Sequence, residues 1–178
     1  MFPRAVMTRA GARGALAIAV TVLLLARPGA AAAPEPGVGA HLATFDDLDF
    51  NVFTHQKWSE LQRSHAKDIV VHWPDGHETK GIDKHIEELK GMFVYAPDTR
   101  IQVHPVKFGS GDWTSVVGVM EGTFTKPMPS ADGKTIPPTG KPFKIEMCTV
   151  GHWKDGVMDE EYLFWDNLTF MKQIGLGQ

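Results

Sequence analysis

The hydrophobic period of the chain changes near Thr99, and this change restricts the fold more than any other feature of the sequence. The residues that follow form long runs rich in β-branched and aromatic side chains, separated by turns that contain Gly or Pro; the runs are 101–108, 113–124, 143–153 and 157–165. Asp155-Gly156 lies between the last two runs, and Asp-Gly is a strong signal for a tight hairpin. The sequence therefore predicts four strands in antiparallel succession.

Helical spacing of apolar residues dominates the part of the chain before Thr99. The segments with this spacing are 41–53, 56–65 and 82–95, and a fourth short one, 168–174, lies near the C-terminus. Residues 68–73 form a β-branched run that ends at Pro74-Asp75-Gly76, which predicts a strand and a turn. Helices early and strands late are typical of an α+β fold.

The first 32 residues have the three parts of a secretory signal. Three arginines precede an apolar stretch, residues 15–26, and Ala30-Ala31-Ala32 provides a small-residue cleavage site. We expect a signal peptide over 1–32, a flexible tether over 33–40 and one α+β domain over 41–178, in a protein that is periplasmic or secreted. An uncleaved anchor is the alternative, but 12 uncharged apolar residues are short for a membrane span.

The charge of the mature part excludes some partners. Residues 33–178 hold 14 basic and 21 acidic side chains, and such an acidic surface argues against nucleic acid or anionic lipid as the main partner. We also expect no membrane insertion after processing. Cys148 is the only cysteine, so no intrachain disulfide can form, and stability must come from the core.

Several segments of the sequence are similar to one protein family. They are DIVVHWP (68–74), GI (81–82), and above all GVMDEEYLFWD (156–166) followed by MKQIGL (171–176). In these segments the chain resembles the SnoaL-like polyketide cyclases, also called ester cyclases, of the nuclear-transport-factor-2-like superfamily. The resemblance implies a cone-shaped, curved antiparallel sheet wrapped by three N-terminal helices, with a short C-terminal helix. It also implies a homodimer, a pocket for a small hydrophobic molecule, and chemistry without metal or cofactor.

The family closes polyketide rings with a carboxylate on the last strand and a His on the partner strand, and these positions fall on Leu163 and Thr149. Glu161 is the nearest ionisable replacement, two residues from Leu163 and so on the same face of the strand. A hairpin turning at residues 155–156 through a three-residue loop would place Thr149 near Glu161, Met147 near Leu163 and Ile145 near Trp165. Apolar surroundings would raise the pKa of Glu161 toward neutrality and suit it to acid/base catalysis.

Other residues are weaker candidates for the site. We expect His72 or His77 to polarise a substrate carbonyl, and Asp166 to cap the last helix and also to lie at the cone mouth. His72, Asp75, His77 and His85 have the right atoms for a metal, but no established ligand spacing appears, so we expect no metal site. The predicted substrate-contacting residues are Trp73, Trp113, Met147, Thr149, Leu163 and Trp165.

Two functions and a purely structural role, a dimer with a filled cone, remain open from the sequence. The first is a cofactor-independent exported enzyme that uses Glu161, His72, His77 and Asp166 on a small hydrophobic carbonyl compound. The second is a non-catalytic secreted binding protein for a small apolar metabolite, which the residues at positions 149 and 163 favour. An apolar outer strand face that includes Val150 and Phe164 predicts a dimer interface, and the proline-rich segment 126–142 fits a lid and a passive loop equally well.

Overall fold

The computed structural model describes residues 36–130 and 132–177, so the expected signal peptide lies outside the described residues. The helices are α1 (Pro36–Asp47), the π-helical turn η1 (Leu48–Phe53), the 3-10 helix η2 (Trp58–Arg63), α2 (Ile82–Tyr95) and α3 (Asn167–Gln173). The strands are β1 (His65–His72), β2 (Glu78–Lys80), β3 (Arg100–Ile101), β4 (Val106–Ser110), β5 (Trp113–Thr123), β6 (Met128–Pro129), β7 (Thr135–Ile136), β8 (Pro142–Lys154) and β9 (Val157–Trp165). None of the described helices has the length and apolar character that crossing a membrane requires.

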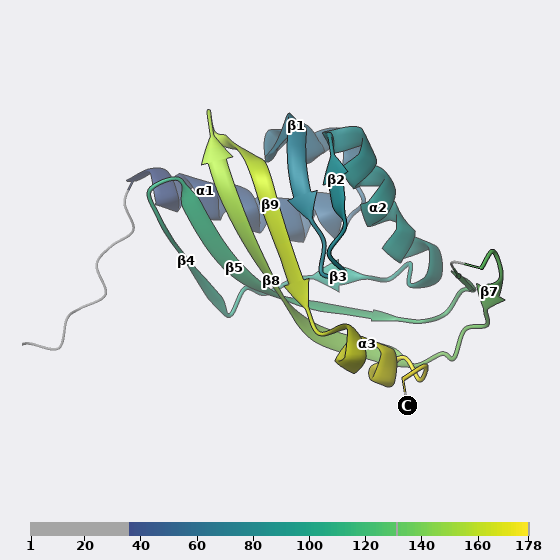
Figure 1. Cartoon of the computed structure of the whole chain (residues 1–178). Coiled ribbons are helices and arrows are strands. Elements are labelled where there is room, and N and C mark those ends of the chain that lie inside the picture. The colour runs from purple at the N-terminus through teal and green to yellow at the C-terminus, as the bar shows by residue number, and fades with distance from the viewer. Residues whose placement is uncertain (1–35, 131, 178) are drawn as a thin grey trace, which may run out of the picture. The chain divides into compact units, whose positions relative to one another are not determined.

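A single curved sheet organises the domain. Its strands follow the order β2-β1-β9-β8-β5-β3, and β4 pairs with the part of β5 that β3 leaves free (Figure 1). The neighbouring pairs are antiparallel except β1 and β9, which run parallel. The α+β class and the curved sheet expected from the sequence are thus confirmed.

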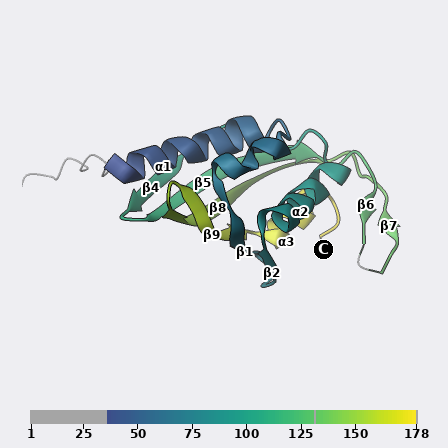
Figure 2. The same ribbon diagram turned by 90° about the horizontal axis from the view of Figure 1, so that it is seen from above.

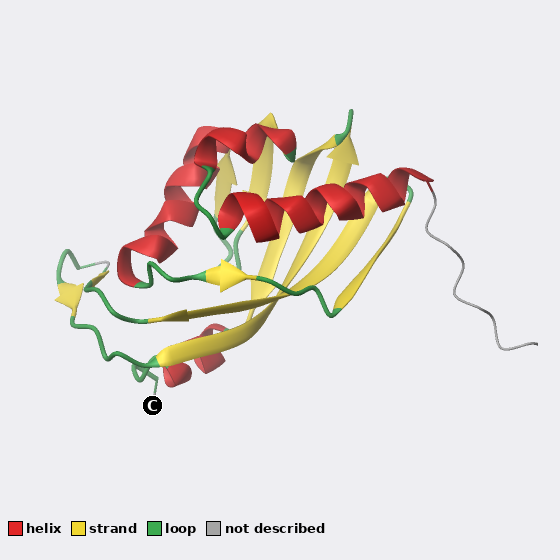
Figure 3. Cartoon of the chain, turned by 180° about the vertical axis from the view of Figure 1, so that it is seen from behind, coloured by secondary structure: helices red, strands yellow, loops and turns green. Residues whose placement is uncertain are grey.

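Helices cover one face of this sheet. Seen from behind, α1 crosses the strands, and η2 and α2 continue the same layer toward β1 and β2 (Figure 3). The view from above shows α1 and α2 on the same side of the sheet (Figure 2). Apolar side chains fill the space between the layers, with Phe45 and Val52 from the first helical segment packed against Val71, Val116 and Leu163 from the strands. This layer of helices closes the curved sheet into a cone.

The first helix is longer than the sequence indicates. It begins at Pro36, so residues 36–40, expected to belong to a flexible tether, are helical, and Val38 is buried. The helix then continues through the π-helical turn, in which Thr54 N donates to Asp49 O five residues earlier. The expected second helix, 56–65, is reduced to the 3-10 helix η2. By contrast, the helix predicted over 82–95 is confirmed with the same bounds.

The predicted strand 101–108 is divided into β3 and β4. Pro105 lies in the gap, and proline has no N–H to donate to a ladder, so regular pairing with β5 stops before it and resumes at Val106. The proline-rich segment 126–142 holds a small hairpin, β6 with β7. Met128 and Ile136 of this hairpin pack on the core near α3, and the described part of the segment contributes nothing to the lining of the cavity discussed below.

The hairpin of β8 and β9 sets the register of the sheet's inner face. Asp155 and Gly156 form a two-residue turn with φ of 53° and 86°, a conformation that suits Asp-Gly. The ladder then skips one residue, Asp159, as a β-bulge, because His152 pairs with Glu160 whereas Trp153 pairs with Met158.

The expected register, based on a three-residue loop, is therefore wrong by two residues. Thr149 pairs with Leu163, Met147 with Trp165, and Gly151 with Glu161. The bulge also changes which side chains face inward. In a regular strand the side chains of Met158 and Glu160 would share the inner face. The extra residue of the bulge shifts this alternation, so that Met158 and Glu161 are buried and Glu160 lies on the outer face.

The close approach of α1 to the β4–β5 hairpin gives a test of the fold. A Cβ on Gly109 would lie 2.9 Å from Val38 Cγ1 and closer still to the Trp113 carbonyl oxygen. Gly109→Ala should therefore lower the free energy of unfolding by about 1–3 kcal/mol in urea titrations. Gly91→Ala on α2 is the control, because a Cβ at this position would meet no atom within 4 Å. This substitution should stabilise the protein by about 0.5–1 kcal/mol, because alanine is favoured over glycine inside a helix. Equal effects of the two changes would contradict the packing of α1.

Candidate functional site

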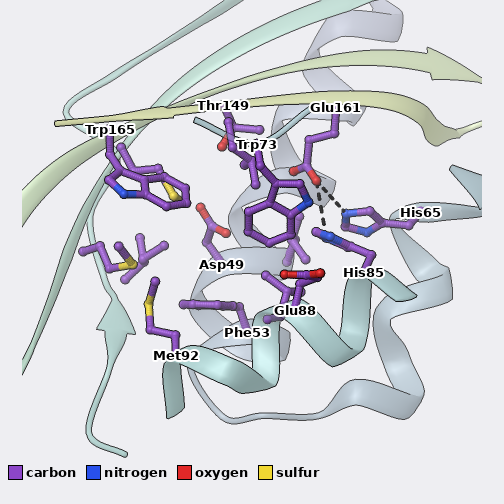
Figure 4. A pocket seen from close by; sticks show the side chains of 16 residues that line it. Asp49, Phe53, His65, Trp73, His85, Glu88, Met92, Thr149, Glu161 and Trp165 are labelled. Atoms are coloured by element: carbon purple, nitrogen blue, oxygen red, sulfur yellow. Dashed lines mark ion pairs between the residues drawn. The ribbon is translucent and has the colours of Figure 1, made fainter. Parts of the chain in front are cut away.

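A cavity lies between the helical layer and the inner face of the sheet. The space between its lining atoms is about 550 Å³ including the open mouth, which leaves room for a compact ligand. Its lining is mostly apolar and consists of Leu48, Asp49, Phe53, His65, Trp73, His85, Glu88, Leu89, Met92, Ile101, Met120, Met147, Thr149, Glu161, Leu163 and Trp165 (Figure 4).

Two tryptophans form the partly exposed wall of this cavity. The rings of Trp73 and Trp165 meet edge to face, with centroids 6.3 Å apart. Each indole N–H has a partner, since Trp73 donates to Thr79 Oγ1 and Trp165 donates to Asn167 Oδ1. The two rings are therefore fixed in place and present apolar faces to a ligand.

A cluster of three buried ionisable side chains, His65, His85 and Glu161, occupies one end of the cavity. They come from β1, α2 and β9, and each is at most 4% exposed. Glu161 Oε2 lies 3.6 Å from His65 Nε2 and 3.4 Å from His85 Nε2, and the imidazole centroids are 5.1 Å apart (Figure 4). We call this set the His65/His85/Glu161 cluster.

The charges of the cluster differ from the expectation for Glu161. Burial would raise the pKa of the Glu161 carboxyl, but the neighbouring imidazoles of His65 and His85 outweigh burial and leave the pKa below its usual value. This direction differs from the raised pKa expected above, because folding brings His65 and His85 beside Glu161. Burial lowers the pKa of His85 to about 4, against the attraction of Glu161, so this imidazole is neutral at pH 7.

The cluster has unsatisfied hydrogen-bonding atoms. His65 Nε2, His85 Nδ1 and Glu161 Oε2 are buried without a hydrogen-bond partner among the described residues. One potential ligand atom from each residue lies within 4.8 Å of the other two, so the three side chains together could hold a metal ion. Of the residues considered as metal ligands from the sequence, only His85 belongs to this group.

A second carboxylate, Asp49, enters the cavity from the helical layer. It belongs to the π-helical turn and is 6% exposed. His104, whose side chain is 1% exposed, lies between two acids: its Nε2 is 2.8 Å from Asp49 Oδ2 and its Nδ1 is 2.8 Å from Asp46 Oδ1. Lys107 pairs with the other oxygen of Asp46 at the surface. A chain of polar contacts thus connects the cavity with solvent.

The pair formed by Asp49 and His104 retains protons to higher pH than either group does in water. Burial raises the pKa of Asp49, and the contacts with His104 only partly oppose it. Burial would lower the pKa of His104, but hydrogen bonds with Asp49 and Asp46 and the charges of these acids raise it. The two carboxyls of the cavity are thus shifted in opposite directions, a pattern found where one group accepts and the other donates a proton.

The structure brings six of the predicted site residues to the cavity. Glu161 lies in the buried cluster, and the other five line the apolar walls: Trp73, Met147, Thr149, Leu163 and Trp165. Their roles remain predictions.

Two predicted residues lie on the outer face of the sheet instead. His72 alternates outward from the buried Val71 and contacts Glu160 at 3.0 Å and Glu78 at 3.3 Å. Trp113 begins β5, is 42% exposed and packs beside His152. Neither residue lines the cavity, because strand alternation turns both side chains away from the helical layer.

The other two predicted catalytic residues are also outside the cavity. His77 is exposed, hydrogen-bonds with Asp75 and stacks on the outer side of Trp73. Asp166 is exposed and caps α3, where it accepts from Thr169 N at 3.0 Å and from Thr169 Oγ1. The capping function of Asp166 is confirmed, whereas its expected position at the cavity is wrong.

Sequence reasoning missed three polar residues that matter here, Asp49, His65 and His104. A usable signal existed for Asp49, which stands four residues after Phe45 on the apolar side of the first helix, where an acid is unusual. His65 was assigned to a helix end and His104 to a strand, so neither position indicated a cavity. Only the folded chain brings these residues to the site.

Removal of the His104 imidazole gives a test of the charge arrangement. His104→Gln should lower the free energy of unfolding by about 3–5 kcal/mol near pH 6, because buried Asp49 loses its charged partner. Folding raises the pKa of His104, so its protonated form stabilises the folded state. This stabilisation is complete at pH values below the ordinary pKa of 6.5 and is lost as the pH rises through the raised pKa. The difference between the two proteins in urea titrations should therefore shrink as the pH rises from about 6 through the raised pKa of His104.

His55→Gln is the control, since His55 is exposed on the loop after the same helical segment. It should leave the free energy of unfolding within about 0.5 kcal/mol of the wild type. A similar loss for both variants would show that His104 does not support Asp49.

Comparisons with known proteins agree with this architecture. A sequence model of the SnoaL-like polyketide cyclase family matches residues 45–174. A search of functionally curated proteins gave no match.

Solved structures with the same fold include proteins named polyketide cyclases. IdmH of Streptomyces antibioticus is 23% identical, with a TM-score of 0.63 over 76% of this chain and 98% of its own. A SnoaL-like polyketide cyclase of Jannaschia sp. CCS1 is 18% identical, with a TM-score of 0.71 over 83% of this chain and 99% of its own. At these identities the likeness shows the fold alone. The family match covers most of the domain, and the chain therefore belongs to the SnoaL-like polyketide cyclase family.

Proposed function

We propose that this protein is an acid/base enzyme of the cyclase type that acts on a small apolar carbonyl compound in the cavity. The observation that carries the proposal is the presence of two buried carboxyls, Asp49 and Glu161, on the same apolar cavity, each beside a buried imidazole. Family membership supports cyclase-type chemistry that needs no organic cofactor. The substrate class comes from the apolar lining.

Asp49 is the group best suited to remove a proton. Its raised pKa makes Asp49 a stronger base than an ordinary carboxylate, and the neighbouring His104 balances the charge that Asp49 bears when ionised. Glu161 has a lowered pKa and is therefore the weaker base of the two. We accordingly assign the base to Asp49 in place of Glu161, and we assign to Glu161 the positioning of His65 and His85.

The cluster at the other end of the cavity would stabilise the oxygen of the substrate. When Asp49 takes a proton from the carbon next to a carbonyl, negative charge develops on the carbonyl oxygen. An imidazole N–H of His85 can donate to that oxygen in a site that water does not screen. The enolate carbon then attacks a second carbonyl of the same molecule, and the new alkoxide takes a proton from protonated Asp49, which restores the base.

The shape of the cavity supports a compact, flat substrate. Trp73 and Trp165 present ring faces that suit an aromatic or unsaturated ligand. A non-catalytic binding protein is the second candidate, because Leu163 and Thr149 stand where the family's acid and histidine are implied.

We also infer export and self-association. The signal-like first 32 residues support delivery to the periplasm or the medium. Exposed apolar side chains on the outer strand face support a homodimer there, with Phe108 at 61% and Phe164 at 53% exposure. A mature mass beginning at Ala33, and a dimer in native mass spectrometry, are the expected outcomes.

The assignment of Asp49 as the base is tested with 5-nitrobenzisoxazole. The isoxazole ring of this compact bicyclic probe opens when a base removes its acidic C–H proton and the N–O bond breaks. Asp49→Asn should lower kcat/KM for this reaction by about 100-fold or more. In the wild type, kcat/KM should rise with pH to a plateau, because the base acts when deprotonated, and the apparent pKa should lie above the ordinary 3.8.

Asp47→Asn is the matched control, two residues earlier and paired with Arg63 outside the cavity, and it should leave kcat/KM unchanged. If Glu161→Gln abolishes turnover while Asp49→Asn retains it, the assignment of the base is wrong. Saturable binding of the probe with equal slow turnover in wild type and Asp49→Asn would instead favour the binding protein.

A further inference from the structure

We propose that the His65/His85/Glu161 cluster binds a divalent transition-metal ion, with zinc as the first candidate. The geometry of the three ligand atoms supports this. Tetrahedral zinc has bonds of about 2.0–2.2 Å to nitrogen and oxygen, which places neighbouring ligand atoms about 3.3–3.5 Å apart. In the cluster, Glu161 Oε2 lies 3.4 Å from His85 Nε2 and 3.6 Å from His65 Nε2.

The hydrogen bonds around His65 define which of its nitrogens faces the cluster as a free ligand. Ser64 Oγ is 3.1 Å from Leu61 O, a carbonyl that can only accept, so the single hydroxyl proton of Ser64 is donated there. Ser64 Oγ then accepts from His65 Nδ1 at 2.8 Å. In the neutral ring this leaves Nε2 with a lone pair directed toward the Glu161 carboxylate.

Two lone pairs that face each other in a buried site need a cation between them. His65 Nε2 and Glu161 Oε2 are both buried without a hydrogen-bond partner among the residues that the structure describes, and both residues are at most 4% exposed. An unpaired buried polar atom destabilises a fold, so such a pair calls for an occupant. A proton on His65 would satisfy these two atoms alone, whereas a metal ion would satisfy both atoms and His85 at once.

The ligand set also suits catalysis. Two histidines and a glutamate leave at least one coordination position open, as in hydrolytic zinc enzymes. The Ser64 contact supplies the outer hydrogen bond that fixes the orientation of a metal-bound imidazole. Because all three residues line the cavity, the open position faces the space that holds the substrate. A bound ion would polarise a carbonyl oxygen in place of the imidazole N–H assigned above.

The test uses the purified mature chain after removal of metals with a chelator, and Co²⁺ as a spectroscopic probe. Wild type should bind one Co²⁺ per chain, with the intense visible absorption of a four-coordinate site, and Zn²⁺ should displace it. Glu161→Gln retains the shape of the side chain and should weaken Co²⁺ binding on the order of 100-fold or more. His85→Gln is a second variant in case one substitution prevents folding, which circular dichroism detects.

The outer face of the sheet provides the matched control. His72 lies between Glu160 and Glu78 there, a set of similar residues exposed to solvent, and His72→Gln should leave Co²⁺ binding unchanged. If Co²⁺ binding is lost in His72→Gln but retained in Glu161→Gln, or if folded wild type binds no stoichiometric Co²⁺, the proposal is overturned.

The metal proposal and the proposed function can fail separately. Asp49→Asn should lose turnover of the benzisoxazole probe and still bind Co²⁺ as the wild type does. Absence of turnover in every variant leaves the metal result intact, because Co²⁺ binding is measured without a substrate. Equal Co²⁺ binding in wild type and in a folded Glu161→Gln would overturn the metal site alone.

Discussion

Burial of a carboxylate in an apolar cavity is the constraint on which the rest of the site depends. Glu161 and Asp49 are each at most 6% exposed, and a buried charge of this kind needs partners close by. The chain supplies imidazoles from distant segments in both cases: His65 and His85 for Glu161, and His104 for Asp49. The helical layer and the last strand are therefore held in one relative position by electrostatics as well as by apolar packing.

Both carboxylates reach the cavity through local departures from regular structure. The π-helical turn widens the first helix at Asp49, and the β-bulge at Asp159 turns Glu161 inward in place of Glu160. The sequence allowed prediction of α2, β5, β8 and β9, because their apolar periods and turn residues are local signals. A single inserted residue leaves those signals almost unchanged, so the register that decides the chemistry was not predictable.

Strand alternation alone brings some of the predicted site residues to the cavity. Thr149 and Leu163 lie at the cavity because they belong to the inward parity of their strands. The expected position of His72 at the cavity is wrong. The neighbouring Val70 and Val71 are both apolar, so the hydrophobic pattern does not distinguish the two faces of β1. His65 could not be predicted, since it joins the cluster only through the parallel pairing of β1 with β9.

The parallel pairing of β1 with β9 also determines when the site forms during folding. His65 is opposite Met158 in the ladder, so the two strands that carry the cluster are separated by most of the domain sequence. Contacts between residues so distant in sequence form slowly, because the intervening chain must first be ordered. A nascent chain that has completed every other strand still has a gap between β1 and β8. The His65/His85/Glu161 cluster therefore forms only after the last strand has been synthesised and inserted into the centre of the sheet.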